Sequence, residues 1–157
     1  MEDTRLLRWI STLLILLIAG HGFCEDEKKE KYLFYLTSSS VPTISMQSVI
    51  EQSQKLNARV IIVAYGIDED RVLLKHLDPL VNKMKFLFKP NPYIFDENGV
   101  KQVPALLTAT CNEYNNFRSD SCEYEYIIYG DISLIGYLEI LKDKDAYYEQ
   151  EYRRAVQ

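Results

Sequence analysis

Two short runs of strand-forming residues, separated by a stretch with helical periodicity, constrain this chain more than any other feature. Lys31–Thr37 (KYLFYLT) and Arg59–Tyr65 (RVIIVAY) are rich in aromatic and β-branched residues, which is typical of strands. The second run is almost continuously apolar, as in a central strand that is covered on both faces, and Gly66 ends it. Strands joined through a helix have to lie parallel, so we expect a parallel pair inside a layered α/β domain.

The segment between these runs has the pattern of an amphipathic helix from Thr43 to Leu56. Polar residues such as Gln47 and Glu51 occupy one side. The apolar side is expected to consist of Ile44, Met46, Val49, Ile50 and Leu56. A second helical pattern covers Glu69–Phe88, and Pro79 is expected to kink or divide it.

The second half of the chain predicts a hairpin followed by a helix. Lys89–Lys101 contains Pro90, Pro92 and Gly99 and is interpreted as a linker with a turn at Asp96–Gly99. Short strands are expected at Ala105–Ala109 and Glu125–Tyr129, paired directly as a hairpin, with a helix through Ser133–Leu141. The order β-α-β-α-β-β-α is that of an α/β, thioredoxin-like three-layer sandwich, placed at residues 31–141.

Residues 1–24 have the pattern of a secretory signal peptide. Arg5 and Arg8 frame the start of the segment, and the apolar run Trp9–Ala19 is too short to cross a bilayer as a stable helix. Cleavage is expected between Cys24 and Glu25, with the domain order placed after a cleaved leader. Two alternatives stay open: an uncleaved membrane anchor, and a lipoprotein in which Cys24 is acylated.

The segments that flank the predicted domain are charged. Residues 25–30 are interpreted as a charged N-terminal linker. Residues 142–157 are charged and rich in tyrosine, without a clear apolar stripe, and are expected to form a solvated helical extension. The length of 157 residues allows no more than one domain with a tail.

Several function classes lack the residues they need. The net charge of −5, without a basic cluster longer than Lys28-Lys29, argues against nucleic-acid binding. The six glycines form no phosphate-binding loop, so no small-molecule substrate or cofactor is expected. After leader removal His76 is the single histidine, too few for a zinc site, and no Gly-x-Ser-x-Gly motif presents a nucleophile. We therefore expect no catalytic residue and no metal.

The segment that follows the first predicted strand is Ser38-Ser39-Ser40-Val41-Pro42-Thr43. A thioredoxin-like enzyme carries a Cys-x-x-Cys motif there, because the N-terminus of the next helix lowers the thiol pKa. Hydroxyls are expected to cap that helix, and they cannot carry two electrons in disulfide exchange. Redox catalysis at this degenerate loop is excluded on chemical grounds.

Val103-Pro104 directly precedes a predicted strand. Taken alone, it reads as an ordinary proline at a strand entry, since only about 5–6% of X-Pro bonds in folded proteins are cis. Its position late in the β-α-β-α-β order instead favours the cis-proline that faces the redox site in thioredoxin-like proteins.

Cys111 and Cys122 flank a polar connection between the two late strands. In an oxidising compartment they are expected to form a structural disulfide that contributes roughly 2–3 kcal/mol. The alternative is a reactive pair in a thiol-disulfide oxidoreductase or isomerase, although no neighbouring histidine or basic cluster lowers either pKa.

Tyrosine is unusually abundant, with 12 residues in the chain. Tyr35, Tyr65 and Tyr129 lie on predicted strands and are expected to be core or half-buried. Other tyrosines, if exposed, would suit a protein-binding surface, because a tyrosine ring is rigid and has a polar tip.

Four segments together resemble the TrbC family, the pilin-assembly proteins of F-type conjugative systems. They are Ser38–Pro42, Asn91–Phe95, Gly99–Leu106 and Tyr129–Leu134, within about residues 31–141. The resemblance implies a periplasmic, thioredoxin-like protein of a type IV secretion apparatus that works with the TraW component in pilus assembly and is not an enzyme. On this basis we expect a non-catalytic assembly factor that binds a partner protein through a groove near Pro42 and Pro104.

Overall fold

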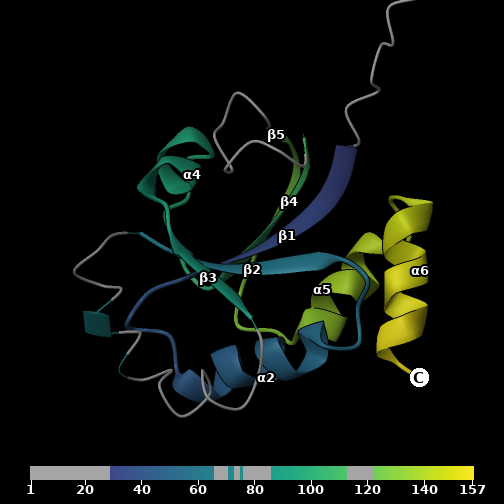
Figure 1. The fold of residues 1–157 in the computed structure, drawn as a ribbon, viewed down its shortest axis with the longest axis horizontal. Helices are drawn as coiled ribbons and strands as arrows, with labels where there is room; N and C mark the ends of the chain where they lie inside the picture. The colour runs from purple at the N-terminus through teal and green to yellow at the C-terminus, as the bar shows by residue number, and fades with distance from the viewer. Residues whose placement is uncertain (1–28, 66–70, 73–74, 76–85, 113–121) are drawn as a thin grey trace, which may run out of the picture.

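Five strands form one mixed sheet in the order β3-β2-β1-β4-β5 (Figure 1). The computed structural model describes residues 29–65, 71–72, 75, 86–112 and 122–157. The strands are β1 Lys29–Thr37, β2 Arg59–Ala64, β3 Leu87–Pro90, β4 Ala105–Asn112 and β5 Cys122–Tyr129. The helices are α2 Thr43–Ser53, α4 Pro92–Glu97, α5 Leu134–Leu141 and α6 Ala146–Ala155. The predicted leader 1–24, its cleavage point at Cys24 and Glu25, His76 and most of the predicted helix Glu69–Phe88 lie outside the described residues.

The pairing of the strands confirms the expected topology. β1 and β2 are parallel, with Tyr32 opposite Arg59, and β3 continues the parallel set beside β2. β4 runs antiparallel to β1, and β5 pairs antiparallel with β4 as the predicted hairpin. The chain therefore forms an α/β sandwich with its parallel and antiparallel parts on either side of β1.

Alternating residues of β1 supply the two halves of the core. Leu33 and Tyr35 pack on the side of α2, α5 and α6, whereas Tyr32, Phe34 and Leu36 pack on the side of α4. All five side chains are at most 1% exposed. Because successive side chains of a strand point to opposite faces, one strand can hold both helical layers against the sheet. The described elements thus make three layers.

The interpretation of Lys89–Lys101 as a linker is wrong. Residues 87–90 form β3, and residues 92–97 form the short helix α4. Both prolines fit this arrangement, since Pro90 ends a strand at the sheet edge and Pro92 begins a helix, where its missing N–H costs no hydrogen bond. Phe88, the last residue of the predicted helix Glu69–Phe88, belongs to β3 instead.

The C-terminal segment is helical as predicted, but one face of the helix is buried rather than solvated. Tyr148, Glu151 and Ala155 of α6 are at most 2% exposed, and α6 packs beside α5 (Figure 1). These residues are spaced three and four apart, so they share one face of the helix. The sequence pattern did not indicate this buried face, because one of its three residues is a glutamate.

Candidate functional site

The end of β1, the start of β4 and the end of β5 lie side by side at one end of the sheet. Leu36 of β1 lies opposite Ala105 of β4, and Ala105 lies opposite Tyr129 of β5. The residues that follow β1, precede β4 and follow β5 are therefore brought together by register alone. The sequence-predicted loop Ser38–Thr43 and Val103-Pro104 both lie at this end of the sheet.

The loop after β1 is held by its own hydrogen bonds. The hydroxyls of Ser38 and Ser40 share a hydrogen bond of 2.7 Å, and the Val41 N–H donates to the Ser38 carbonyl at 3.1 Å. Val41 is buried, whereas Ser39 and Ser40 are exposed. The expectation that these hydroxyls cap α2 is wrong, because Pro42 occupies the N-cap position without a side-chain hydrogen bond.

The peptide bond between Val103 and Pro104 is cis. The Pro104 carbonyl accepts a hydrogen bond of 3.0 Å from the N–H of Gly130, which follows β5. Gly130 has a φ of 125°, a conformation that favours glycine, and it turns the chain from β5 toward α5. This hydrogen bond thus joins the cis-proline to the Gly130 turn at the same end of the sheet.

An open hollow lies between the first turns of α2 and the Gly130 turn. Ser45 donates its hydroxyl to Asp131 Oδ2 at 2.9 Å across this hollow, which joins the two elements. We call it the Asp131 hollow; its lining residues are Ile44, Ser45, Ser48, Asp131, Ile132 and Ser133.

A second open hollow lies at the end of β1, where Thr37 and Ser38 form part of its wall. Its wall includes Tyr65, whose ring packs edge-to-face on Phe95 at 5.4 Å and whose hydroxyl donates to Asp96 Oδ1 at 3.3 Å. We call it the Lys101 hollow; its lining residues are Thr37, Ser38, Tyr65, Phe95, Val100, Lys101, Gln102 and Val103. We call the two hollows, together with the Ser38–Pro42 loop and Val103-Pro104 at the same end of the sheet, the candidate binding groove.

The sequence predicts that Tyr35, Tyr65 and Tyr129 are core or half-buried. Tyr35 is fully buried, whereas Tyr65 is 48% and Tyr129 is 44% exposed, so the first lies in the core and the other two are about half-buried. Ile44 is 70% exposed, whereas the buried side of α2 consists of Met46, Val49 and Ile50. The spacing of these three was the missed signal, because Ile44 lies off their line on the helix and shares its face with Gln47 and Glu51.

The negative charge of Asp131 reaches tyrosines beneath the groove. Burial and, to a smaller extent, the nearby Asp131 carboxylate together raise the pKa of Tyr137 to about 12. Burial likewise raises the pKa of Tyr35, with smaller contributions from Tyr137 and Asp131. Both phenols therefore remain protonated at neutral pH, and the Tyr137 hydroxyl donates to the Gly130 carbonyl. This bond fixes the turn that carries Asp131.

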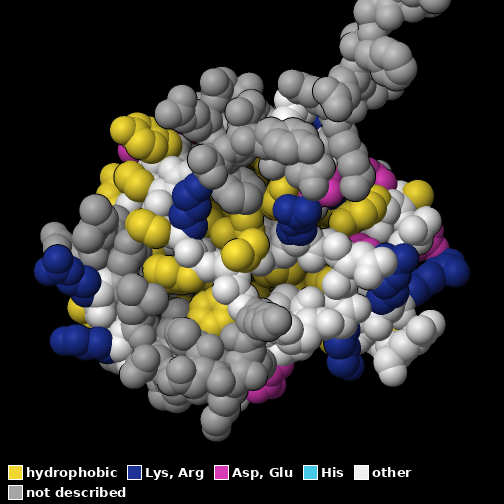
Figure 2. All heavy atoms as spheres, in the orientation of Figure 1, with side chains coloured by type: hydrophobic (Ala, Val, Ile, Leu, Met, Phe, Trp, Pro, Cys, Tyr) yellow, Lys and Arg dark blue, Asp and Glu magenta, His cyan; other side chains and the backbone are white. Residues whose placement is uncertain are grey.

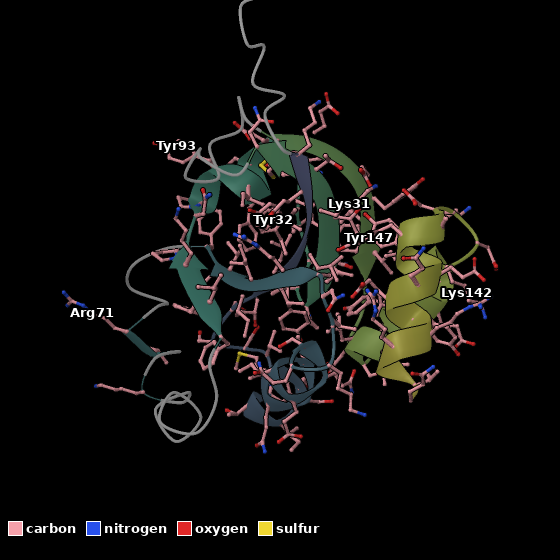
Figure 3. All side chains as sticks on the ribbon, turned by 45° about the vertical axis from the view of Figure 1, so that its right-hand side comes forward. Lys31, Tyr32, Arg71, Tyr93, Lys142 and Tyr147 are labelled. Atoms are coloured by element: carbon pink, nitrogen blue, oxygen red, sulfur yellow. A yellow bond between two sulfur atoms is a disulfide. The ribbon has the colours of Figure 1, made fainter. Side chains whose placement is uncertain are left out.

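Cys111 and Cys122 form a disulfide that lies far from the groove. Cys111 is opposite Glu30 near the start of β1, whereas the Ser38–Pro42 loop follows the end of that strand. The six steps along β4 from Ala105 correspond to about 20 Å. The sulfur pair can be followed in Figure 3, at the end of the sheet away from α2. Cys111 is 1% exposed, so this pair fits a structural bond between paired strands.

The described surface combines an apolar area with dispersed basic side chains (Figure 2). Figure 2 shows hydrophobic side chains gathered over the centre of one face, with Lys and Arg side chains dispersed around them. Within the described ranges, no group of three or more His, Cys, Asp or Glu side chains is placed to hold a metal ion. In the same part of the chain, none of the helices has the length and apolar character needed to span a membrane.

Solved structures with similar folds are distant in sequence. StoA from Bacillus subtilis is 16% identical, with a TM-score of 0.48 over 76% of this chain and 84% of that one. An uncharacterized thioredoxin-like protein from Porphyromonas gingivalis is 12% identical, with a TM-score of 0.47 over 77% of each chain. MTB dsbF, solved in mixed oxidized and reduced forms, is 14% identical, with a TM-score of 0.43 over 81% and 79%. No curated protein matches this chain.

The strand order, the parallel β1–β2 pair and the cis-proline ahead of β4 make the fold the thioredoxin-like sandwich that the sequence predicts. The family model described as "Type-F conjugative transfer system pilin assembly protein" matches residues 35–141. This range extends from within β1 to the last residue of α5 and contains the whole groove. The chain therefore belongs to the TrbC family of type-F conjugative transfer system pilin assembly proteins.

Proposed function

We propose that this protein is a non-catalytic assembly factor for a conjugative pilus, which acts by binding another transfer protein in its groove. The family match over residues 35–141 is the observation that carries the assembly role. Family membership also implies that the partners are among the transfer proteins. A TraW-like component is the partner we expect first.

The chemistry of the groove supports binding rather than catalysis. Serine hydroxyls occupy the loop where a redox enzyme of this fold would need thiols, and Ser38 and Ser40 bond to each other. The disulfide of Cys111 and Cys122 lies at the other end of β4. Exposed Ile44 and Tyr65 provide apolar or rigid contact area at the groove, which is the composition that favours protein interfaces.

The periplasm is the compartment that fits this role. The leader pattern in residues 1–24 favours export, and a structural disulfide persists in an oxidising compartment. A pilus-assembly family also works in the cell envelope. We therefore place the mature chain in the periplasm, beginning at Glu25.

Deletion of the gene in a conjugative donor tests the assembly role. We expect loss of pili and a fall in transfer frequency, and recovery of both when the wild-type chain is supplied. Transfer that is unchanged after deletion would contradict the proposal.

The double variant Cys111→Ser, Cys122→Ser tests the non-catalytic part. Supplied to the deletion strain at a temperature where it stays folded, it should restore pili as the wild type does. The purified wild-type chain should not accelerate insulin reduction. Insulin reduction that the double variant lacks, together with failed complementation, would instead favour a thiol-disulfide oxidoreductase.

A further inference from the structure

The Asp131 hollow combines an exposed carboxylate with exposed apolar side chains. Ile44 is 70% exposed and Ile132 is 36% exposed, and both line the hollow together with Asp131. Ser45 and Ser133 are already engaged, since Ser45 donates to Asp131 and Ser133 accepts from the Gly136 N–H to cap α5. The hollow therefore offers a bound segment one negative charge between two isoleucines.

The charge of Asp131 is not compensated within the described part of the chain. Its carboxylate accepts a hydrogen bond from a neutral hydroxyl, and no lysine or arginine among the described residues pairs with it. Other carboxylates on the sheet do have partners of opposite charge: Glu30, Glu123 and Glu125 each form an ion pair with a lysine or an arginine. The Asp131 charge is instead felt by the phenols of Tyr35 and Tyr137, whose pKa values burial raises first and the carboxylate raises further.

Resting on the proposed function, we infer that the Asp131 hollow receives a lysine or arginine side chain from an extended segment of a partner transfer protein. Such a side chain has an alkyl stem that can cover Ile44 and Ile132 and a cationic head that can pair with Asp131. The head would add a charge-assisted bond to the carboxylate that Ser45 already orients.

Other occupants fit the same hollow less well. An anionic lipid surface or a nucleic acid would bring negative charge toward Asp131, which disfavours both. A divalent cation needs several oxygen ligands, and the hollow supplies one carboxylate beside hydroxyls that have other partners. A second copy of this chain remains as an outcome of the test.

The test begins with a photocrosslinking residue, benzoylphenylalanine, at Ile132 of the full-length chain in a conjugating donor. We expect a crosslink to another transfer protein, mapped to a segment that contains a lysine or an arginine beside an apolar residue. A crosslink to a segment without a basic residue, to a second copy of this chain or to lipid would overturn the inference, as would the absence of any crosslink.

Charge exchange then separates pairing from mere proximity. Asp131→Lys should lower both the crosslink yield and the transfer frequency at least tenfold, and replacing the mapped basic residue by aspartate should restore them. Asp143→Lys is the matched control, because Asp143 is also exposed but lies between α5 and α6. It should behave as the wild type.

The outcomes distinguish this inference from the function on which it rests. If deletion abolishes transfer but Asp131→Lys complements fully, the inference fails and the assembly role stands. If deletion leaves transfer unchanged, the assembly role itself fails. A melting curve of Asp131→Lys that matches the wild type excludes unfolding as the cause of a defect. If that variant does not fold, the crosslink yield of Asp131→Asn decides, and a yield equal to that of the wild type would overturn the inference.

Discussion

Charged side chains near the two ends of β1 differ in whether they have a partner of opposite charge. Near its start, Lys31 Nζ lies 2.9 Å from Glu125 Oε1 and 2.8 Å from Asp145 Oδ2, so its charge is fully paired. Figure 3 shows Lys31 reaching from β1 toward Tyr147 on α6. At the other end, Asp131 bonds a neutral hydroxyl beside exposed isoleucines.

The paired end holds the C-terminal helix on the domain. Glu125 also accepts hydrogen bonds from the hydroxyls of Thr110 at 2.7 Å and Tyr148 at 2.8 Å. Glu151 of α6 is fully buried and accepts from the backbone N–H groups of Asn57 at 2.8 Å and Ala58 at 3.0 Å. We call this set of contacts the α6 clamp. The charges that hold α6 on the domain are paired within the chain, whereas Asp131 at the groove has no lysine or arginine partner among the described residues.

Among changes to the α6 clamp, Glu151→Ala should cause the largest loss of stability. The change leaves two backbone N–H groups without their acceptor and Arg154 without its ion-pair partner, so we expect a loss of about 2–4 kcal/mol in the free energy of unfolding. Urea unfolding measures it. Glu149→Ala, on the same helix, removes an ion pair with Arg153 at the surface and should cost less than about 0.5 kcal/mol. Equal losses in the two variants would show that α6 is not clamped through Glu151.

Loss of the disulfide should weaken the domain without altering the groove. Cys111→Ser with Cys122→Ser removes a cross-link between residues 11 apart, which corresponds to about 2–3 kcal/mol of the free energy of unfolding. Thermal unfolding with and without reductant measures it in the wild type. Crosslinking at Ile132 should stay at the wild-type level in the folded double variant, and a change there would mean that the two ends of the sheet are coupled.

Acid should weaken the α6 clamp in the wild type more than in Lys31→Met. Burial raises the pKa of Glu125, but hydrogen bonds from Lys31, Thr110 and Tyr148 outweigh it and hold that pKa below the ordinary 4.5. The hydrogen bond from Lys31, with that from the Tyr147 N–H, likewise holds the pKa of Asp145 below 3.8. Their contribution is therefore fully present above these ordinary values and is lost as pH falls through the lower folded-state values.

For Lys31→Met we expect a loss of about 1–2 kcal/mol at neutral pH, since the ion pairs are partly buried. The difference from the wild type should shrink as the pH is lowered below about 4. Urea unfolding across this range measures both curves. A difference that stays constant with pH would mean that Lys31 stabilises the fold through its cation–π contacts with Tyr147 and Tyr148 rather than through the two ion pairs.

Ile44→Glu should have the smallest effect on stability and a large effect on function. The side chain is 70% exposed, so the free energy of unfolding should change by less than about 0.5 kcal/mol. Complementation of the deletion donor should nevertheless fall, because the new carboxylate enters the groove. Glu139→Gln on the outer side of α5 is the control and should complement fully. Normal pili with Ile44→Glu would place the binding surface elsewhere.

Local patterns accounted for the strands and helices whose apolar residues are regular. The run of Arg59–Tyr65 predicted β2, and Met46, Val49 and Ile50 gave α2 its buried side. β3 and α4 escaped prediction because Pro90 and Pro92 read as breakers, although each lies where a proline is tolerated. The buried side of α6 escaped because Glu151 is polar, and burial of a carboxylate becomes favourable only when distant N–H groups are brought to it.

The sequence by itself determined the parallel strand pair, the late hairpin, the absence of thiols in the Ser38–Pro42 loop and the resemblance to a pilus-assembly family. These features depend on residue type and on spacing along the chain, which are local. Only the tertiary structure decided which tyrosines and isoleucines are exposed and which carboxylates are paired. Glu125, Glu151 and Asp131 are chemically alike, and their roles differ because the register of the sheet places partners near the first two and leaves the third facing the groove.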